Sequence, residues 1–182
     1  MKKLVLVFAL ALASVGSFAQ MKKSVKVGGA AMYPSKNIIE NAVNSKDHTT
    51  LVTAVKAAGL VETLSSAGPF TVFAPTNKAF DKLPAGTVET LVKPESKATL
   101  TSILTYHVVA GKMSATDIVA AIKAGNGKAM MKTVQGGTLT ATMKGKNVII
   151  TDEKGGMSKV TIADVNQSNG VIHVIDTVLM PK

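Results

Sequence analysis

The stretch NGVIHVIDTVLMPK, residues 169–182, is almost entirely apolar and β-branched, a pattern typical of a buried strand. Two titratable residues, His173 and Asp176, stand three positions apart within it. Residues three apart on a strand point to opposite faces, so this pair cannot converge as an acid and a base without a bulge. We therefore interpret both as polar members of a core strand, whose hydrogen bonds fix that strand against its neighbours.

The segments before this strand change from a helical period to a period of two. Between positions 138 and 143, threonines alternate with Leu139, Ala141 and Met143, as expected for a half-buried strand. The expected strands are 138–143, 148–151 and 160–165, and the turns that follow them are 144–147, 152–156 and 166–170. Successive hairpins of this kind predict an antiparallel β-sandwich.

The first half of the chain is helical in pattern. From Thr50, apolar residues recur at helical spacing until Gly59, a residue typical of helix C-termini. The run FTVFAP at 70–75 predicts a buried strand that ends at a proline, and Thr76 can cap the helix that follows. Two more helices are expected, one from Pro94 with the apolar stripe Leu100, Ile103, Leu104 and then His107, the other capped by Ser114 and Asp117 and ended by Gly125. The fold class is therefore α+β, with several helices packed at one side of the sandwich.

The N-terminus has the pattern of a secretory signal peptide. Two lysines precede the apolar segment 4–15, and Ser17 and Ala19 are the small residues expected before a cleavage site. The expected organisation is a signal peptide at 1–19, a flexible leader rich in lysine and glycine at 20–36, and one domain at 37–182. We therefore expect a secreted, periplasmic or cell-surface protein with no integral membrane segment after signal removal. Because the chain has no cysteine, its core must be stable without disulfides.

The charge is strongly basic and is carried by lysine alone. The formal net charge is +10, with 21 basic residues and no arginine among them. Proteins that read nucleic acid rely on arginine, whose planar guanidinium pairs with guanine edges and phosphates. Tryptophan is absent as well, so little is available for stacking on bases. We therefore expect no nucleic-acid partner, and a lysine surface that is either simply solvated or attracted to an anionic polymer or membrane surface.

Three motifs in sequence order resemble those of the fasciclin-like (FAS1) domain, namely TVFAPTNKAF at 71–80, LTYHVVAGK at 104–112 and NGVIHVIDTVLMP at 169–181. The resemblance extends from about Asn37 to Pro181. It implies a wedge-shaped β-sandwich decorated by helices. For function, it implies an exported or surface-bound adhesion module that binds protein or glycan partners. Animal adhesion members carry several copies of the domain, whereas this chain holds one.

The resemblance also gives candidate site residues. Tyr106 and His107 match the Tyr-His motif of the family, which is associated with adhesion. The residues themselves allow another interpretation, in which His107 closes an apolar helical stripe and is hydrogen-bonded in the core, with Tyr106 packed beside it. Asn77 and Phe80 match the first motif. There we expect Phe80 to anchor the core and Asn77 to cap or bridge backbone.

Catalysis and metal binding are not expected. The sequence has no Gly-x-Ser-x-Gly elbow, no His-Glu-x-x-His helix and no glycine-rich phosphate loop. Its histidines, His48, His107 and His173, lie far apart and no cluster of carboxylates accompanies them at ligand spacing, so neither a metal nor another cofactor is predicted.

The leading hypothesis is therefore a non-catalytic module that binds a cell-surface or matrix protein or an anionic glycan, as a monomer or weak homo-oligomer. The resemblance leaves one alternative, a carrier of an apolar small ligand such as a carotenoid, because some exported members of the family bind carotenoids. Nine methionines offer the adaptable lining that such a site needs.

Overall fold

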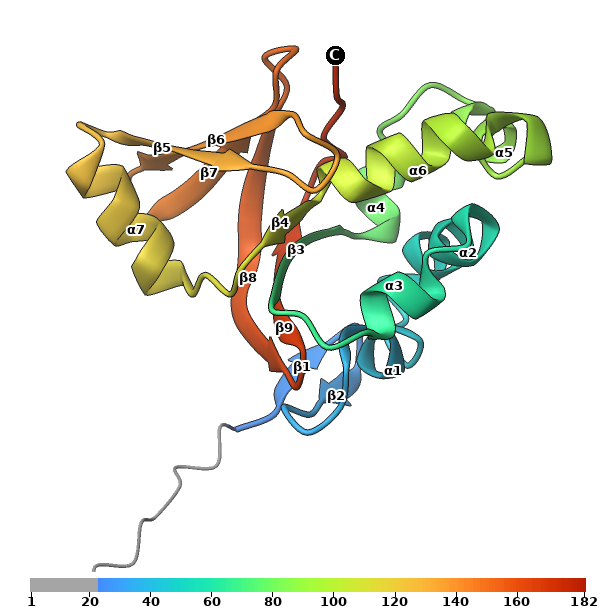
Figure 1. Ribbon diagram of the computed structural model, residues 1–182, viewed down its shortest axis with the longest axis horizontal. Helices are drawn as coiled ribbons and strands as arrows, with labels where there is room; N and C mark the ends of the chain where they lie inside the picture. Colours follow the sequence, from blue (N-terminus) through green and yellow to red (C-terminus); the bar gives the residue numbers. More distant parts are fainter. Residues whose placement is uncertain (1–22) are drawn as a thin grey trace, which may run out of the picture.

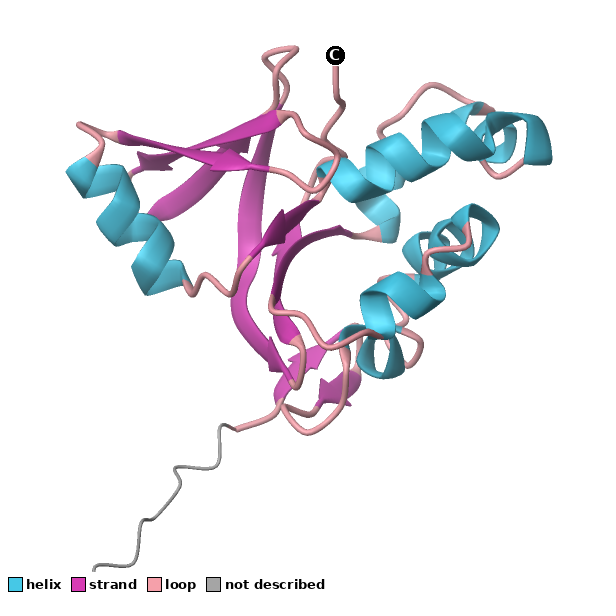
Figure 2. Cartoon of the chain, viewed as in Figure 1, coloured by secondary structure: helices cyan, strands magenta, loops and turns pink. Residues whose placement is uncertain are grey.

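The computed structural model describes residues 23–182, and the predicted signal peptide lies outside this range. Most helices gather at one side of a large sheet, while one helix packs at its far end (Figures 1 and 2). The helices are α1 (Ile38–Ala42), α2 (Thr49–Ala58), α3 (Val61–Ser65), α4 (Asn77–Phe80), α5 (Thr87–Leu91), the 3-10 helix η1 (Pro94–Ser96), α6 (Lys97–Tyr106) and α7 (Ala115–Ala124). The strands are β1 (Val25–Val27), β2 (Ala30–Met32), β3 (Phe70–Pro75), β4 (Val108–Ala110), β5 (Lys128–Lys132), β6 (Thr138–Lys144), β7 (Asn147–Thr151), β8 (Met157–Gln167) and β9 (Gly170–Ile175). None of the helices in the described range is long and apolar enough to cross a membrane.

The main sheet has seven strands in the order β4-β3-β9-β8-β7-β6-β5. The long strand β8 joins its two parts, because its first residues pair with β7 and its later residues pair with β9. Irregularities in register between Val160 and Val165 bend β8 at this junction. A bridge between Val109 and Thr133 then brings β4 back to the chain just after β5. The sheet therefore folds over itself into a nearly closed sandwich, and the predicted α+β class is confirmed.

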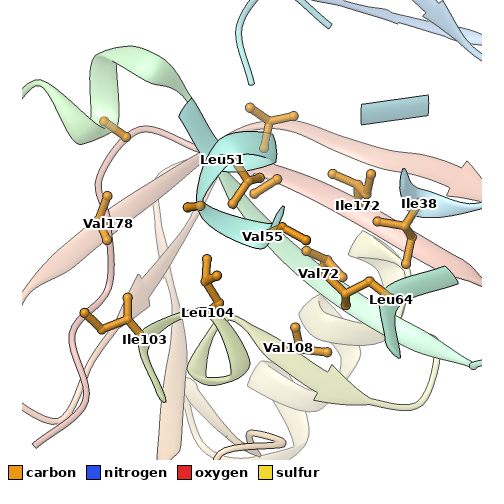
Figure 3. Packing of buried hydrophobic residues seen from close by; sticks show 14 of the residues in the cluster. Ile38, Leu51, Val55, Leu64, Val72, Ile103, Leu104, Val108, Ile172 and Val178 are labelled. Atoms are coloured by element: carbon orange, nitrogen blue, oxygen red, sulfur yellow. The ribbon is translucent and has the colours of Figure 1, made fainter. Parts of the chain in front are cut away.

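The central strands β3 and β9 are buried on both faces, which explains their continuous apolar sequences. Val72 and Ile172 face a first core cluster shared with the helices α2, α3 and α6 (Figure 3). Phe73 and Ile175 face a second cluster on the other side. That cluster lies between α7 and the strands β5–β7, and it includes Tyr106. The strand pair thus separates two apolar cores.

The helix boundaries follow local signals in the sequence. Gly59 ends α2 in the left-handed conformation, at φ 74°. The Thr76 side chain caps α4, and Ser114 and Asp117 form a reciprocal capping box at the start of α7. Pro94 opens a short 3-10 turn that leads into α6. The boundaries predicted at Gly59, Thr76 and Ser114 are confirmed, whereas the helix predicted from Pro94 becomes α-helical only at Lys97.

The predicted flexible leader is wrong over residues 25–32. This segment is a hairpin in which β1 pairs with β2, and Val27 and Met32 are each only 1% exposed. The Gly28-Gly29 pair forms the turn, with φ values of 58° and 81° that glycine adopts at little cost. Two strands of three residues are too short to show periodicity, so the double glycine was the one usable signal.

Two further expectations about the last strand need correction. The predicted turn 166–170 is reduced to Ser168-Asn169, because β8 continues to Gln167, which pairs with Gly170. Hairpins alone also do not build the sheet, since β3 and β9 run parallel. At their start a side chain on Gly170 would lie 2.2 Å from the Phe70 carbonyl oxygen, so only glycine fits there. Gly170 is therefore required by the contact between β3 and β9, which are distant in sequence, rather than by the turn that precedes it.

Candidate functional site

Tyr106, in the last turn of α6, lies fully inside the second core cluster. Its hydroxyl donates a hydrogen bond to the Thr138 carbonyl at 2.9 Å and accepts one from the Glu153 backbone N–H at 3.0 Å. Burial raises the pKa of Tyr106, and the nearby carboxylates of Glu153 and Asp152 act in the same direction. Tyr106 therefore connects α6 to β6 and to the β7–β8 turn.

His107 follows directly as the C-cap of α6 and is 3% exposed. Nδ1 lies 2.8 Å from the Ile103 carbonyl oxygen, which can only accept, and Nε2 accepts from the Leu179 N–H at 3.0 Å. These partners fix the neutral tautomer with the proton on Nδ1. Burial lowers the pKa of His107 to about 4. The ring therefore connects α6 to the C-terminal segment as a neutral group.

Asp152 completes this arrangement. The side chain is buried, and Oδ1 accepts from the Gly156 N–H at 2.7 Å within the β7–β8 turn. Oδ2 accepts from the Met180 N–H at 2.9 Å, one residue after the N–H held by His107. Tyr106, His107 and Asp152 thus form one internal bracket, which joins α6, the β7–β8 turn and the C-terminal segment. No side-chain surface of Tyr106 or His107 is offered to a partner.

His173 and Asp176 do not meet. His173 donates from Nε2 to the Met113 carbonyl at 2.9 Å, accepts from the Asp164 N–H at 3.4 Å, and stacks on Phe73 with ring centroids 5.8 Å apart. Burial lowers its pKa, and the backbone bond to Met113 opposes this. The ring thereby fixes the chain before α7 against β9 and the bend of β8.

Asp176 lies just after β9 rather than on it, so it is not a member of that strand as the sequence pattern suggested. Its Oδ1 accepts from the Lys159 N–H at 2.9 Å, and its Oδ2 lies 3.9 Å from the Lys82 ammonium. Partial burial raises the pKa of Asp176. The hydrogen bonds and Lys82 outweigh that effect and hold the pKa below its ordinary value.

Asn77 and Phe80 lie at the other end of β3. The Asn77 side chain accepts from the Thr50 N–H at 3.1 Å and donates to the Lys46 carbonyl at 2.8 Å, so it joins α4 to the start of α2. Phe80 is 7% exposed within the first core cluster. Asn77 thus bridges backbone groups and Phe80 packs in the core.

An apolar cavity of about 40 Å³ lies within the first core cluster, between the helices and the strands β3, β4 and β9. Its walls include Val55, Val72, Leu104, Val108 and Ile172, which Figure 3 shows around one space. Two histidines also line it, His48 and His107. They are distant in sequence, so only the fold brings them to one cavity, and no local pattern would have found the pair.

His48 is the less satisfied of the two histidines. Its Nδ1 lies 2.9 Å from the Ser45 hydroxyl, whereas Nε2 has no hydrogen-bond partner among residues 23–182. Burial lowers its pKa, and the Ala74 carbonyl and the Asp47 carboxylate oppose that shift. One buried ring nitrogen of a residue that lines the cavity therefore has no hydrogen-bond partner among residues 23–182. Within the described range, no group of histidine and acidic side chains is arranged to hold a metal ion.

Comparison with known proteins identifies the family. The sequence profile of the fasciclin domain matches residues 46–181. The chain belongs to the fasciclin domain family. The fold agrees, because this fasciclin domain superimposes with a TM-score of 0.70 on a FAS1 domain pair from the insect cell adhesion molecule fasciclin I, over 80% of this chain and 51% of that one, at 20% identity.

Two curated relatives are similar over most of the chain. A Synechocystis protein designated sll1483 is 48% identical over 179 residues, which are 96% of this chain and 91% of the relative. The cell surface glycolipoprotein MPB83 of Mycobacterium bovis is 34% identical over 166 residues, which are 91% of this chain and 64% of that protein. The similarity to these two relatives thus extends over nearly the full length of this chain.

Proposed function

We propose that this fasciclin domain is an exported, non-catalytic binding module that attaches to an anionic partner, either a glycan or a protein of the cell surface or matrix. The observation that carries the proposal is a set of exposed lysines whose positive charge is not neutralised by acidic side chains. Within residues 23–182, Lys82 forms an ion pair with Asp176 at 3.9 Å. Lys128, Lys144 and Lys159 are exposed and take part in no ion pair there. Such a surface attracts polyanions over several ångströms of solvent.

The relatives support a location outside the cytoplasm. One is a cell surface glycolipoprotein, and the structural neighbour comes from a cell adhesion molecule. The N-terminal sequence, with its lysine pair and apolar segment, has the pattern of an export signal. We place the mature protein in the periplasm, in the medium or at the cell surface on these grounds.

The internal hydrogen bonds favour binding over chemistry. His107, His173 and Asp152 each direct their polar atoms to backbone groups, so none is available to take or give a proton at a substrate. A general acid or base needs a free position within hydrogen-bond reach of the reacting group. We assign Tyr106 and His107 an indirect role in binding, because their hydrogen bonds fix the β7–β8 turn and the C-terminal segment.

Retention on an immobilised polyanion tests the proposal. The purified mature protein should bind polygalacturonate in low salt, elute as the salt rises past physiological strength, and pass through a neutral dextran matrix. Exposed charges are screened over about 8 Å at physiological ionic strength, so salt should release it. Equal retention on both matrices, or on neither, would contradict the proposal.

A second candidate function is the transport of an apolar ligand, and the cavity beside His48 favours it. The cavity has an apolar lining, and His48, one of the residues around it, has a ring nitrogen without a hydrogen-bond partner among residues 23–182. The size of the cavity argues against a long molecule, because about 40 Å³ is room for only a few water molecules. A carotenoid would fit only if α2 and α3 moved away from the sheet.

Protein purified from its native source tests this second candidate. A visible absorption band, or an apolar compound released by organic solvent and identified by mass spectrometry, would support transport. A colourless protein whose extract contains no stoichiometric compound would exclude it.

A further inference from the structure

The strands β5, β6, β7 and the first part of β8 form a sheet with one buried and one open face. Ala129, Met131, Leu139, Ala141 and Ile150 point inward to the second core cluster, where α7 covers them. Because side chains alternate along a strand, the residues between them point outward. Among these, Met130 is 72% exposed and Met157 is 67% exposed, so no part of the described chain covers this outer face.

The register of the strands arranges the outer residues in rows. One row crosses all four strands, and its members are Lys128, Thr142, Ile149 and Lys159. The next row, two residues along each strand, consists of Met130, Thr140, Thr151 and Met157. A third, shorter row pairs Lys132 with Thr138. The outer face thus has lysines near its margins and threonine hydroxyls across its centre.

The charged residues of these rows are all lysines, although two carboxylates border the rows, since Glu153 and Asp176 accept hydrogen bonds from the Thr138 and Lys159 N–H groups. Lys128, Lys132, Lys144 and Lys159 are all exposed, and none forms an ion pair within the described chain. The acidic residues nearest in sequence lie in the β7–β8 turn. Asp152 there is buried, and Glu153 at the edge of the face accepts a hydrogen bond from the Thr138 N–H. No acidic residue belongs to any of the rows.

The dimensions suit a linear polymer that lies flat. Neighbouring strands are about 4.8 Å apart, so the backbones of Lys128 and Lys159 are separated by about 14 Å across the sheet. Lys128 and Lys132 lie about 13 Å apart along β5. Lysine is a flexible point charge and tolerates variable positions of an anion. Threonine both donates and accepts, as recognition of sugar hydroxyls requires.

We infer that the outer face of β5–β8 is a binding site for an acidic polysaccharide, a sugar polymer with repeated carboxylate or sulfate groups. Lysines at the margins contact its anions, and Thr140, Thr142 and Thr151 form hydrogen bonds with its hydroxyls. An anionic membrane fits less well, because threonines separate Met130 from Met157 and no continuous apolar patch is present for insertion. This inference rests on the proposed function and gives it a location and a ligand class.

Paired lysine variants of the intact mature protein test the location. The double variant Lys128→Gln with Lys159→Gln should bind polygalacturonate about five- to tenfold more weakly in calorimetry, since each exposed charge pair contributes modestly. The matched control, Lys78→Gln with Lys93→Gln, removes two exposed lysines from the helical half and should change the affinity less than twofold. Thr140→Val with Thr151→Val keeps all charges and should also weaken binding severalfold.

Each other outcome identifies which part fails. Equal weakening by both lysine pairs would mean diffuse attraction, which would overturn the site while leaving the proposed function intact. No binding of polygalacturonate by the parent protein at low salt would contradict the proposed function as well. The inference would also be overturned if the parent protein bound vesicles that contain anionic lipid but did not bind the polysaccharide, and if Met130→Asp abolished the binding to vesicles. That result would assign the face to a membrane.

Discussion

The backbone N–H of Leu179 donates a hydrogen bond to Nε2 of His107 at 3.0 Å, although the two residues are 72 positions apart. The other ring nitrogen of His107 is occupied by the Ile103 carbonyl. The neighbouring Met180 N–H is held by Asp152. The Tyr-His motif, which the resemblance associates with adhesion, is thus in this protein the centre of an internal bracket that fixes the C-terminal segment.

Replacing His107 by alanine should lower the free energy of unfolding by about 2–4 kcal/mol, because it leaves the Leu179 N–H unpaired and empties volume in the core. Urea unfolding followed by circular dichroism measures this. The control His107→Gln keeps a hydrogen-bond acceptor and should lose less. An alanine variant as stable as the parent would show that the link contributes nothing.

The stability should fall in mild acid. Burial lowers the pKa of His107 from 6.5 to about 4. The unfolded ring binds a proton below about pH 6.5 while the folded ring stays neutral, so stability present above that pH is lost as the pH falls toward about 4. At 1.36 kcal/mol per pH unit, His107 alone accounts for about 3 kcal/mol. His48 and His173, whose pKa values burial also lowers, act in the same direction.

Unfolding free energies at about pH 7 and pH 4.5 test this dependence. The drop should be smaller in His107→Gln, which has no titrating ring at that position. The pKa values of Asp176 and Asp117 are held below the ordinary aspartate value of 3.8, so these residues lose their contribution to stability only at lower pH and do not affect the comparison. A parent protein equally stable at both pH values would contradict the neutral, buried His107.

Phe80→Ala should cost about 3–5 kcal/mol of unfolding free energy, as truncation of a buried aromatic side chain usually does. The side chain is only 7% exposed and packs in the first core cluster. Met130→Ala is the matched control, since Met130 is 72% exposed and should change stability by less than about 0.5 kcal/mol. A fully stable Phe80→Ala variant that no longer binds would reassign Phe80 to the surface site.

The N-terminal hairpin should contribute to the stability of the domain. A protein that begins at Asn37 lacks the buried Val27 and Met32, and should lose about 3–6 kcal/mol relative to one that begins at Gln20, at about 1.5–3 kcal/mol for each side chain. Thermal unfolding of the two proteins provides the comparison. Equal melting temperatures would restore the interpretation of this segment as a leader.

Local signals in the sequence predicted the elements whose cause is local. Thr76 and Ser114 cap the helices expected from them, and Phe70–Pro75 is a strand because a proline stops an apolar run. The parallel pairing of β3 with β9 was not predicted, because it joins segments about a hundred residues apart and leaves no periodic trace in either. Both strands are buried on two faces, so alternation could not reveal their partners.

For the candidate sites too, the residues in local motifs could be predicted from the sequence, whereas their distant partners could not. Tyr106 and His107 could be selected from their motif, but their partners Thr138 and Leu179 come from distant parts of the chain. The outer face of β5–β8 could be foreseen only in part. Alternation placed Thr138, Thr140 and Thr142 on one side of a strand, whereas the row from Lys128 to Lys159 depends on the register of four strands.

Chemical footprinting of lysines on the unmodified mature protein tests the central claim most directly. The protein would be acetylated with and without saturating polygalacturonate, and the extent of modification at each lysine measured by mass spectrometry. We predict severalfold protection of Lys128, Lys132, Lys144 and Lys159, which share the outer face, and unchanged modification of Lys78 and Lys93 in the helical half. Protection spread evenly over both sets, or confined to Lys78 and Lys93, would contradict a polyanion site on this face.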